Sequence, residues 1–340
     1  MSKKSLHTAM QQKKDEFYTQ LKDIEDELKH YKDQFRGKVV YCNCDDPFES
    51  NFFRYFALNF KSLGLKQLIT TSYKPSPIAN TQLGLFGDDK TLPEPKGRPK
   101  VTANKFIINE VHDIDGNGAF NLADVAEQLK ANKNNEWAPL EGDGDFRSPE
   151  CVELLKKSDI VVTNPPFSLF REYLAQITNH DKKFLIIGNK NSITYKEIFK
   201  LIKENRLWLG YRNINSDMWL QVPEGEQYEK VVDGVKLKHI MACWLTNLDT
   251  TKRHEEFTMY KPYQPEYYPK YDNYDAINVN VVAEIPRDYN GAMGVPITFL
   301  DKYNPDQFEI IKFRKGDDDR DLVINGKSPY FRILIKKRKI

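Results

Sequence analysis

Short apolar runs alternate along this chain with segments whose apolar residues recur at helical spacing. Many of these runs are rich in β-branched residues, which is typical of buried parallel strands. The pattern predicts strands at residues 38–44, 66–71, 105–110, 160–163, 183–188, 207–209 and 242–246. It predicts helices at 20–35, 47–60, 121–130, 168–177 and 195–205. Strands that alternate with helices in this way indicate an α/β fold.

The strand predicted at 160–163 ends abruptly in Asn164, Pro165, Pro166 and Phe167. A proline has no N–H to donate to a strand ladder, so the strand must stop there. Helical spacing then begins at Ser168. A strand, loop and helix joined at the carboxyl end of a parallel sheet is where α/β folds bind ligands.

These four residues suit recognition of a planar group that carries an NH₂. The Asn164 side-chain oxygen can accept one N–H and the Pro165 carbonyl another, and Pro166 stiffens the turn. Phe167 offers a flat face on which a ring can stack. Drawing both amino hydrogens into acceptors turns the nitrogen lone pair towards an electrophile. The alternative is a strand end followed by a proline-stiffened turn.

Composition limits the other possibilities. A chain of 340 residues with 40% hydrophobic residues can form one large domain and a smaller unit. No apolar run approaches the length of a membrane span, and the polar start does not resemble a signal peptide. The cysteines and histidines do not show metal-ligand spacing, so we expect no metal. Together these features favour a cytoplasmic protein.

Several further segments carry a resemblance to a known family. They are Asp15–Thr19, Val39–Pro47, Gly142–Ser148, Ser192–Lys196, Tyr268–Asn280 and Met293–Leu300. Together with Asn164–Phe167, they resemble the EcoRI-type adenine DNA methyltransferases, which are type II modification enzymes that use S-adenosylmethionine. The similarity runs from about residue 13 to about 338, and is weakest at 74–135 and 211–240.

The resemblance implies a Rossmann-like S-adenosylmethionine-dependent methyltransferase sheet with a small C-terminal target-recognition lobe. Residues 1–247 would form the catalytic domain, with insertions at about 74–135 and 211–240, and residues 248–340 would form the DNA-binding lobe. The implied activity is methylation of the amino nitrogen of a flipped adenine in duplex DNA. The implied state is a monomer, with a separately encoded restriction endonuclease as a possible partner.

The resemblance also implies the cofactor site. Asp15, Phe17, Tyr18 and Thr19 match the family's first cofactor motif, a loop that folds over the methionine end of S-adenosylmethionine. The alternative is a capped helix start in which Phe17 and Tyr18 are packed.

Asn43 lies near the end of the first predicted strand, and the turn that follows contains Asp45 and Asp46 and has no glycine. It departs from the general cofactor fingerprint but matches the EcoRI-type branch, in which Asn43 and one of the aspartates would face the cofactor. The alternative is that one of these aspartates only caps the following helix, because Asp-Pro suits a helix start.

Asp145 and Phe146 match the residues that lie against the cofactor adenine in the family. We expect the segment Gly142–Phe146 to end a third strand of the sheet. Asp145 would then accept a hydrogen bond from the adenine amino group, and Phe146 would pack on its ring. The alternative is a simple Asp-Gly turn.

Two regions are candidates for DNA contact. Turn residues within 211–240 predict a β-hairpin. After residue 247 the chain becomes rich in tyrosines, namely Tyr260, Tyr263, Tyr267, Tyr268, Tyr271 and Tyr274. Tyrosines near basic residues suit contacts with nucleic acid, and they suit ordinary packing equally well.

Two other functions remain open at this stage. One is methyl transfer to an RNA amino group or to a protein glutamine amide, since those enzymes also use Asn-Pro-Pro followed by an aromatic residue. The other is a DNA-binding protein without catalytic activity.

Overall fold

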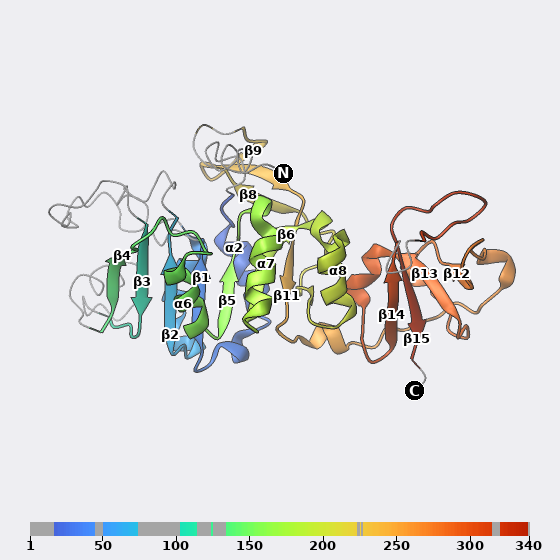
Figure 1. The fold of residues 1–340 in the computed structure, drawn as a ribbon, viewed down its shortest axis with the longest axis horizontal. Coiled ribbons are helices and arrows are strands. Elements are labelled where there is room, and N and C mark those ends of the chain that lie inside the picture. Colours follow the sequence, from blue (N-terminus) through green and yellow to red (C-terminus); the bar gives the residue numbers. More distant parts are fainter. Residues whose placement is uncertain are drawn as a thin grey trace. The chain divides into compact units, whose positions relative to one another are not determined.

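The computed structural model describes residues 17–44, 50–73, 103–113, 124, 134–222, 225, 227–314 and 320–338. The chain divides into two compact units. The first runs to Asn189 and includes Asp217–Leu248, and the second comprises Lys190–Ser216 and Asp249–Ile340. The fold is mixed α/β with a large mixed sheet (Figure 1).

The first unit is built on a twisted sheet whose strands lie in the order β4-β3-β2-β1-β5-β6-β11. The strands are β1 (Val39–Asn43), β2 (Gln67–Thr71), β3 (Asn104–Ile108), β4 (Glu136–Pro139), β5 (Ile160–Thr163), β6 (Lys183–Asn189) and β11 (Ala242–Thr246). The central strands β2, β1, β5 and β6 are parallel. β11 is antiparallel to β6, and β3 is antiparallel to β2.

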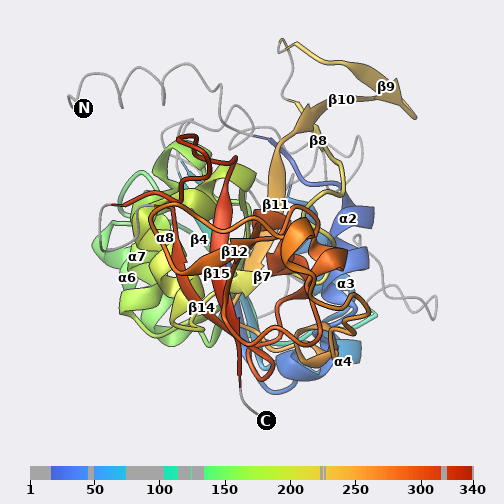
Figure 2. The ribbon, with the colours of Figure 1, turned by 90° about the vertical axis from the view of Figure 1, so that its right-hand side faces the viewer.

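Helices cover both faces of this sheet, which explains why β1, β5 and β11 are buried at every residue. On one face lie α2 (Leu21–Leu28), α3 (Asn51–Leu58) and α4 (Phe60–Leu63), whose apolar side chains form a core with Val40, Ile160 and Trp244. On the other face lie α6 (Pro149–Lys157) and α7 (Phe170–Asn179) (Figure 2). A short 3₁₀ helix, η1 (Lys32–Phe35), follows α2, and another, η2 (Phe167–Leu169), precedes α7.

The predicted strands and helices match these elements closely wherever the apolar runs are fully buried. The strand predicted to end at Gly142–Phe146 is different. β4, the edge strand next to β3, already ends at Pro139, so Gly142–Phe146 is irregular chain that follows the strand. The helix predicted at 121–130 and most of the predicted insertion at 74–135 lie outside the described residues, but β3 belongs to the sheet.

The predicted hairpin is a small antiparallel sheet in the order β8-β10-β9, which we call the ribbon (residues 217–240). It contains β8 (Met218–Gln221), β9 (Lys230–Val232) and β10 (Val235–Ile240). The ribbon projects beyond one end of the large sheet (Figures 1 and 2). Its base is anchored because Met218, Leu220 and Ile240 are buried in the core of the first unit.

The second unit has a sheet in the order β12-β13-β15-β14, formed by β12 (Ala276–Asn278), β13 (Ala292–Pro296), β15 (Arg332–Lys337) and β14 (Phe308–Phe313). α8 (Lys196–Lys203) packs on β14, where the rings of Phe199 and Phe313 are stacked with centroids 4.8 Å apart. The remaining elements are β7 (Trp208–Leu209) and the 3₁₀ helices η3 (Lys190–Thr194), η4 (Thr251–His254), η5 (Pro265–Tyr267), η6 (Val282–Glu284) and η7 (Ile297–Lys302).

The compact units differ in one respect from the domain division expected from the sequence. The segment Lys190–Ser216 lies in the expected catalytic domain, yet it folds with the C-terminal residues. Its helix α8 presents Ile198, Phe199 and Ile202 as a buried apolar stripe, and Phe199 stacks on Phe313. No helix in the described part of the chain is long and apolar enough to cross a membrane.

Candidate active site

The order of the parallel strands marks a binding position. From β1 the chain crosses over to β2 on one side, whereas β5 and then β6 lie on the other side. The carboxyl ends of β1 and β5 are therefore at the point where the strand order reverses, which is the usual ligand position in open α/β sheets. Asn43 is the last residue of β1, and Asn164 directly follows β5.

The nitrogen and the oxygen of the Asn164 side-chain amide differ in their hydrogen bonding. Its Nδ2 donates to the carbonyl oxygen of Phe17 over 2.7 Å. A carbonyl can only accept, so this contact fixes which end of the amide is nitrogen. The Oδ1 of Asn164 is buried and has no hydrogen-bond partner among the residues that the structure describes. Leaving a buried acceptor unpaired costs about 1–3 kcal/mol. The side chain therefore presents an acceptor ready for an external N–H.

The residues after Asn164 form a rigid, partly apolar wall. Pro165 is buried, and the carbonyl oxygen of Pro166 accepts from the N–H of Leu169 over 3.0 Å, which starts η2. Phe167 is half-buried, and its ring centroid lies 6.3 Å from that of Phe17. Leu169, Phe170, Tyr173, Leu174 and Ile177 bury one face of the following helical segment.

The segment Phe17–Gln20 is held by bonds to distant parts of the first unit. Besides the Phe17 bond to Asn164, Tyr18 forms a β-bridge with Gln221 through bonds of 2.9 and 2.8 Å. The carbonyl oxygen of Thr19 accepts from Asn51 Nδ2 over 2.7 Å. Thr19 is buried, and its hydroxyl oxygen has no partner in the described part of the chain. Phe17, Tyr18 and Thr19 are thus brought to the end of β5.

Asn43 is connected differently. It is 2% exposed, and its Oδ1 accepts a hydrogen bond from the hydroxyl of Tyr173 on α7. The ring of Tyr173 packs edge-on against Phe146, with centroids 5.1 Å apart. Asn43 and Phe146, which are far apart in the sequence, are therefore linked through Tyr173. Nothing in the sequence marked Tyr173 for this role, because it occupies an ordinary apolar position of a helix.

Asp145 lies next to Phe146 and is held by Arg147. Its carboxylate accepts from Arg147 Nε over 2.9 Å and Nη2 over 2.6 Å, and Arg147 also contacts Glu172 over 2.7 Å. Burial alone raises the pKa of Asp145, but the hydrogen bonds and charge of Arg147 outweigh it and lower the pKa below its usual value. Gly144 allows this loop to approach β2, since a Cβ there would lie 2.0 Å from the Ser72 carbonyl oxygen.

The structure therefore brings together Phe17, Tyr18, Thr19, Asn43, Phe146 and Asn164–Phe167 at one edge of the sheet. Asp145 is beside them, but its carboxylate is occupied by Arg147. Asp15, Asp45 and Asp46 lie outside the described residues. Sequence reasoning did not identify Gln20, whose side-chain amide donates to the carbonyl oxygen of Trp219 in the ribbon.

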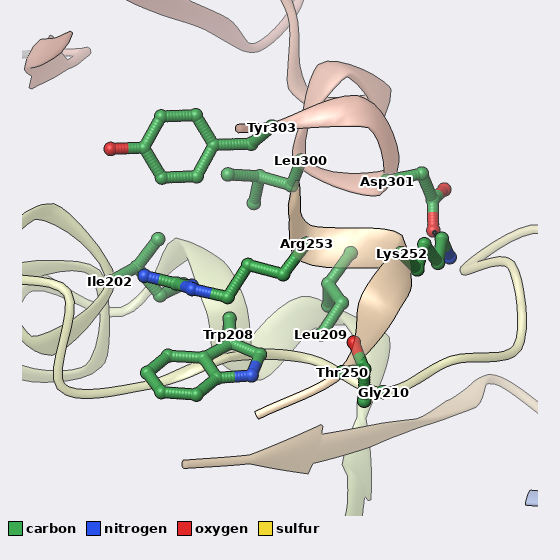
Figure 3. A pocket seen from close by; sticks show the side chains of 10 residues that line it. All are labelled: Ile202, Trp208, Leu209, Gly210, Thr250, Lys252, Arg253, Leu300, Asp301 and Tyr303. Atoms are coloured by element: carbon green, nitrogen blue, oxygen red, sulfur yellow. Dashed lines mark ion pairs between the residues drawn. The ribbon is translucent and has the colours of Figure 1, made fainter. Parts of the chain in front are cut away.

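A hollow in the second unit lies between the segment 202–210 and residues 250–253 and 300–303 (Figure 3). The guanidinium of Arg253 lies 3.7 Å from the centroid of the Trp208 ring and donates to Asn205 Oδ1 over 3.0 Å. Lys252 and the buried Asp301 form an ion pair at 3.5 Å. These charged groups pair with residues of the second unit. Arg253 connects the two segments of that unit, and the hollow lies between them.

The tyrosine-rich region divides between packing and exposure. Tyr268 and Tyr271 are buried, and Tyr271 donates to Asn278 Oδ1 over 2.8 Å. Tyr260 and Tyr267 are 74% and 70% exposed. Packing therefore accounts for Tyr268 and Tyr271, and contact with nucleic acid stays a prediction for the exposed Tyr260 and Tyr267.

Comparison with known proteins identifies the family to which the chain belongs. Residues 5–338 match the family model described as "Adenine-specific methyltransferase EcoRI". The chain is 50% identical to the type II methyltransferase M.EcoRI of Escherichia coli, an alignment covering 99% of this chain and 97% of the relative. It is 35% identical to the type II methyltransferase M.MpnI of Mycoplasma pneumoniae, with 97% of each chain covered.

A third relative is the type II methyltransferase M.MgeORF184P of Mycoplasma genitalium, which is 35% identical with 98% of each chain covered. No solved structure matches the chain. The family match spans nearly the whole sequence and includes both units, so it is not confined to the Asn-Pro-Pro-Phe segment. This chain belongs to the EcoRI family of adenine-specific methyltransferases.

Proposed function

We propose that this protein is a site-specific DNA adenine methyltransferase that modifies the amino nitrogen of adenine in duplex DNA, as part of a restriction-modification system. The observation that carries the proposal is the buried Oδ1 of Asn164 after β5, which has no hydrogen-bond partner among the described residues. The family and its type II relatives supply the substrate class.

The target amino group would be gripped at Asn164–Phe167. Asn164 Oδ1 accepts one amino hydrogen and the Pro165 carbonyl accepts the other, while Phe167 stacks on the base. With both hydrogens directed into acceptors, the nitrogen lone pair leaves the ring plane and points at the methyl donor. Fixed acceptors that need no reorganisation are an effective source of rate enhancement.

The residues present fit S-adenosylmethionine as the methyl donor. Bound there, it supplies an electrophilic sulfonium methyl group. The segment Phe17–Thr19, whose Phe17 carbonyl bonds to Asn164, offers aromatic surface and the buried Thr19 hydroxyl, which has no partner in the described part of the chain. These features suit a polar, positively charged ligand. Asn43 and Phe146 would lie on its adenosine side, with Asp15, Asp45 and Asp46 as further predicted contacts. Both carboxylate oxygens of Asp145 already accept from Arg147, so Asp145 would contact the cofactor only as a shared acceptor.

The target adenine must leave the duplex to reach Asn164, because its amino group is inaccessible inside the stack. Flipping costs a few kcal/mol, which contacts with phosphates and base edges would offset. We assign catalysis to residues 1–247 and DNA contact to residues 248–340, assisted by the ribbon. Tyr260, Tyr267 and Tyr330 are the most exposed large hydrophobic side chains among the described residues of the C-terminal region.

The proposal is tested by incubating the purified chain with plasmid DNA and labelled S-adenosylmethionine, then sequencing single molecules. The expected result is methylated adenine within one short motif. Cofactor binding without any modified adenine would contradict the DNA assignment, and RNA and protein acceptors tested in parallel would identify the alternative. DNA binding without cofactor binding would indicate a non-catalytic protein.

A further inference from the structure

The ribbon contacts the segment Phe17–Gln20 at two neighbouring positions. Tyr18 pairs with Gln221 of β8 through its backbone N–H and carbonyl. Gln20 reaches further along the same strand, and its side-chain Nε2 donates to the carbonyl oxygen of Trp219. The second contact uses a side chain, so a substitution can remove it without disturbing the ladder between Tyr18 and Gln221.

The same segment reaches the candidate catalytic side chain one residue earlier. The carbonyl of Phe17 accepts the hydrogen bond from Asn164 Nδ2 that fixes the orientation of the amide. Phe17, Tyr18 and Gln20 are within four positions of one another, and each bonds to a different residue of the first unit. A shift of the segment against the ribbon is therefore a shift of the Phe17 carbonyl against Asn164.

The orientation of that amide decides whether the site works. The wells of the terminal torsion of asparagine are broad and roughly two-fold, so packing alone restrains it weakly. If the amide turned over, Asn164 would present an NH₂ group to the target amino group, and two donors would face each other. The bond to Phe17 opposes this, because the turned amide would place an oxygen against a carbonyl oxygen.

We propose that the ribbon is a positioning element for methyl transfer, and that Gln20, which bonds to the ribbon, is the principal positioning residue. Through Gln20 and Tyr18 the ribbon holds the Phe17 carbonyl in place, and this carbonyl keeps Asn164 Oδ1 directed at the target. The reactive role of Asn164 rests on the proposed function, but the positioning itself is a property of the free protein and can be measured separately.

The matched test uses two glutamines at the contact between the ribbon and the segment Phe17–Gln20, one on each side of it. Gln20→Ala removes the side-chain bond to Trp219. Gln221→Ala is the control, because Gln221 is exposed and its contacts with Tyr18 use only its backbone. For the native chain and each variant, one measures turnover, the affinities for cofactor and DNA, the melting temperature, and the exchange with solvent of the Asn164 side-chain amide protons by NMR. The NMR signal is assigned by its loss in Asn164→Asp.

We expect Gln20→Ala to lower kcat about tenfold, the scale of one neutral hydrogen bond. The Asn164 amide protons should exchange faster by a similar factor. Cofactor and DNA affinities should stay within about twofold of the native values, and Gln221→Ala should resemble the native chain in every measurement.

Three results would overturn the inference. One is a native exchange rate for the Asn164 amide in Gln20→Ala. Another is a fall in kcat that accompanies equal losses of cofactor affinity, DNA affinity and melting temperature, which would make Gln20 a purely structural residue. The third is an equal effect of Gln221→Ala. If the native chain methylated no adenine, the proposed function would fail, yet the NMR comparison would still decide whether the ribbon positions Asn164.

Discussion

Two asparagines end neighbouring parallel strands in this protein, and their side chains are used in opposite ways. Asn43, at the end of β1, has its Oδ1 occupied by the hydroxyl of Tyr173. Asn164, after β5, uses its nitrogen to fix its own orientation and leaves Oδ1 buried without a partner in the described structure. The residue type is the same and the positions are similar, since Asn43 is the last residue of β1 and Asn164 directly follows β5. The neighbours therefore determine whether the oxygen serves the fold or remains for a ligand.

The contrast also shows how this site is arranged. An unpaired buried acceptor destabilises the free protein, and such a cost is common where a site is preorganised for a ligand. The amide of Asn164 is held by a residue 147 positions away in the sequence. The site therefore depends on the tertiary fold of the whole first unit, including the ribbon.

The comparison is tested by making the same substitution separately at each strand end, and the largest effect is expected at Asn164. Asn164→Ala should lower methyl transfer by at least about 10²–10³-fold, the scale seen when one preorganised hydrogen-bonding group is removed from an active site. Cofactor affinity should remain close to native. The measurement is single-turnover methylation with saturating cofactor, together with cofactor binding by calorimetry. A turnover near that of the native chain would show that Oδ1 does not take part.

Asn43→Ala sharpens the comparison because it should act mainly on stability. It removes the hydrogen bond that the hydroxyl of the buried Tyr173 donates to Asn43, which should cost about 0.5–1.5 kcal/mol in the free energy of unfolding. Methyl transfer per folded molecule should fall less than in Asn164→Ala. Urea unfolding of both variants checks this, and a larger stability loss in Asn164→Ala would reverse the assignment of the two asparagines.

Phe167→Leu tests the stacking surface next to Asn164 while keeping an apolar side chain. The ring is half-buried near Phe17, so we expect little change in stability. Loss of base stacking should weaken transition-state binding by about 1–3 kcal/mol, roughly 5- to 150-fold in kcat/KM. Steady-state kinetics with a short duplex provides the measurement. Unchanged kinetics would indicate that Phe167 only packs against the core.

The smallest expected effect is at Asp145. Because Arg147 lowers the pKa of Asp145, the ionised carboxylate stabilises the folded state above its unfolded pKa, and this contribution is lost as the pH falls through the lowered folded pKa. Arg147→Met should therefore destabilise the protein by less than about 1 kcal/mol at pH 7, since Arg147 is 43% exposed.

That difference between the native chain and Arg147→Met should shrink below about pH 4, where Asp145 begins to be protonated in the unfolded chain. Urea unfolding at pH 7 and at pH 3 measures it. A difference that grew as the pH fell would be inconsistent with stabilisation by the ionised Asp145.

The sequence predicted the parallel centre of the sheet well because those strands are buried on both faces. Ile160–Thr163 and Ala242–Thr246 are mainly apolar, are each followed by an asparagine, and appear as β5 and β11 with the expected limits. The edge strand β4 was harder to predict. Glu136–Pro139 is partly exposed and ends in a proline, so it lacks the apolar signal of a buried strand.

The sequence predicted which segments contribute to the site. It did not predict the side-chain contacts that connect these segments. The motif residues at 17–19, 43, 146 and 164–167 do meet at one edge of the sheet. The connecting residues, Tyr173 and Gln20, lie in positions that are ordinary for a helix and for a helix start. Their roles depend on contacts between residues more than a hundred positions apart, which no local pattern encodes.

The central claim is that Asn164 Oδ1 accepts a hydrogen bond from the target amino group. The most direct test is a crystal structure of the chain with S-adenosylhomocysteine and a duplex that carries its methylation motif. The account predicts the adenine outside the helix, with its amino nitrogen about 2.7–3.2 Å from Asn164 Oδ1 and Nδ2 still bonded to Phe17. An extruded adenine whose amino group bonds elsewhere, with Asn164 Oδ1 facing away, would contradict it.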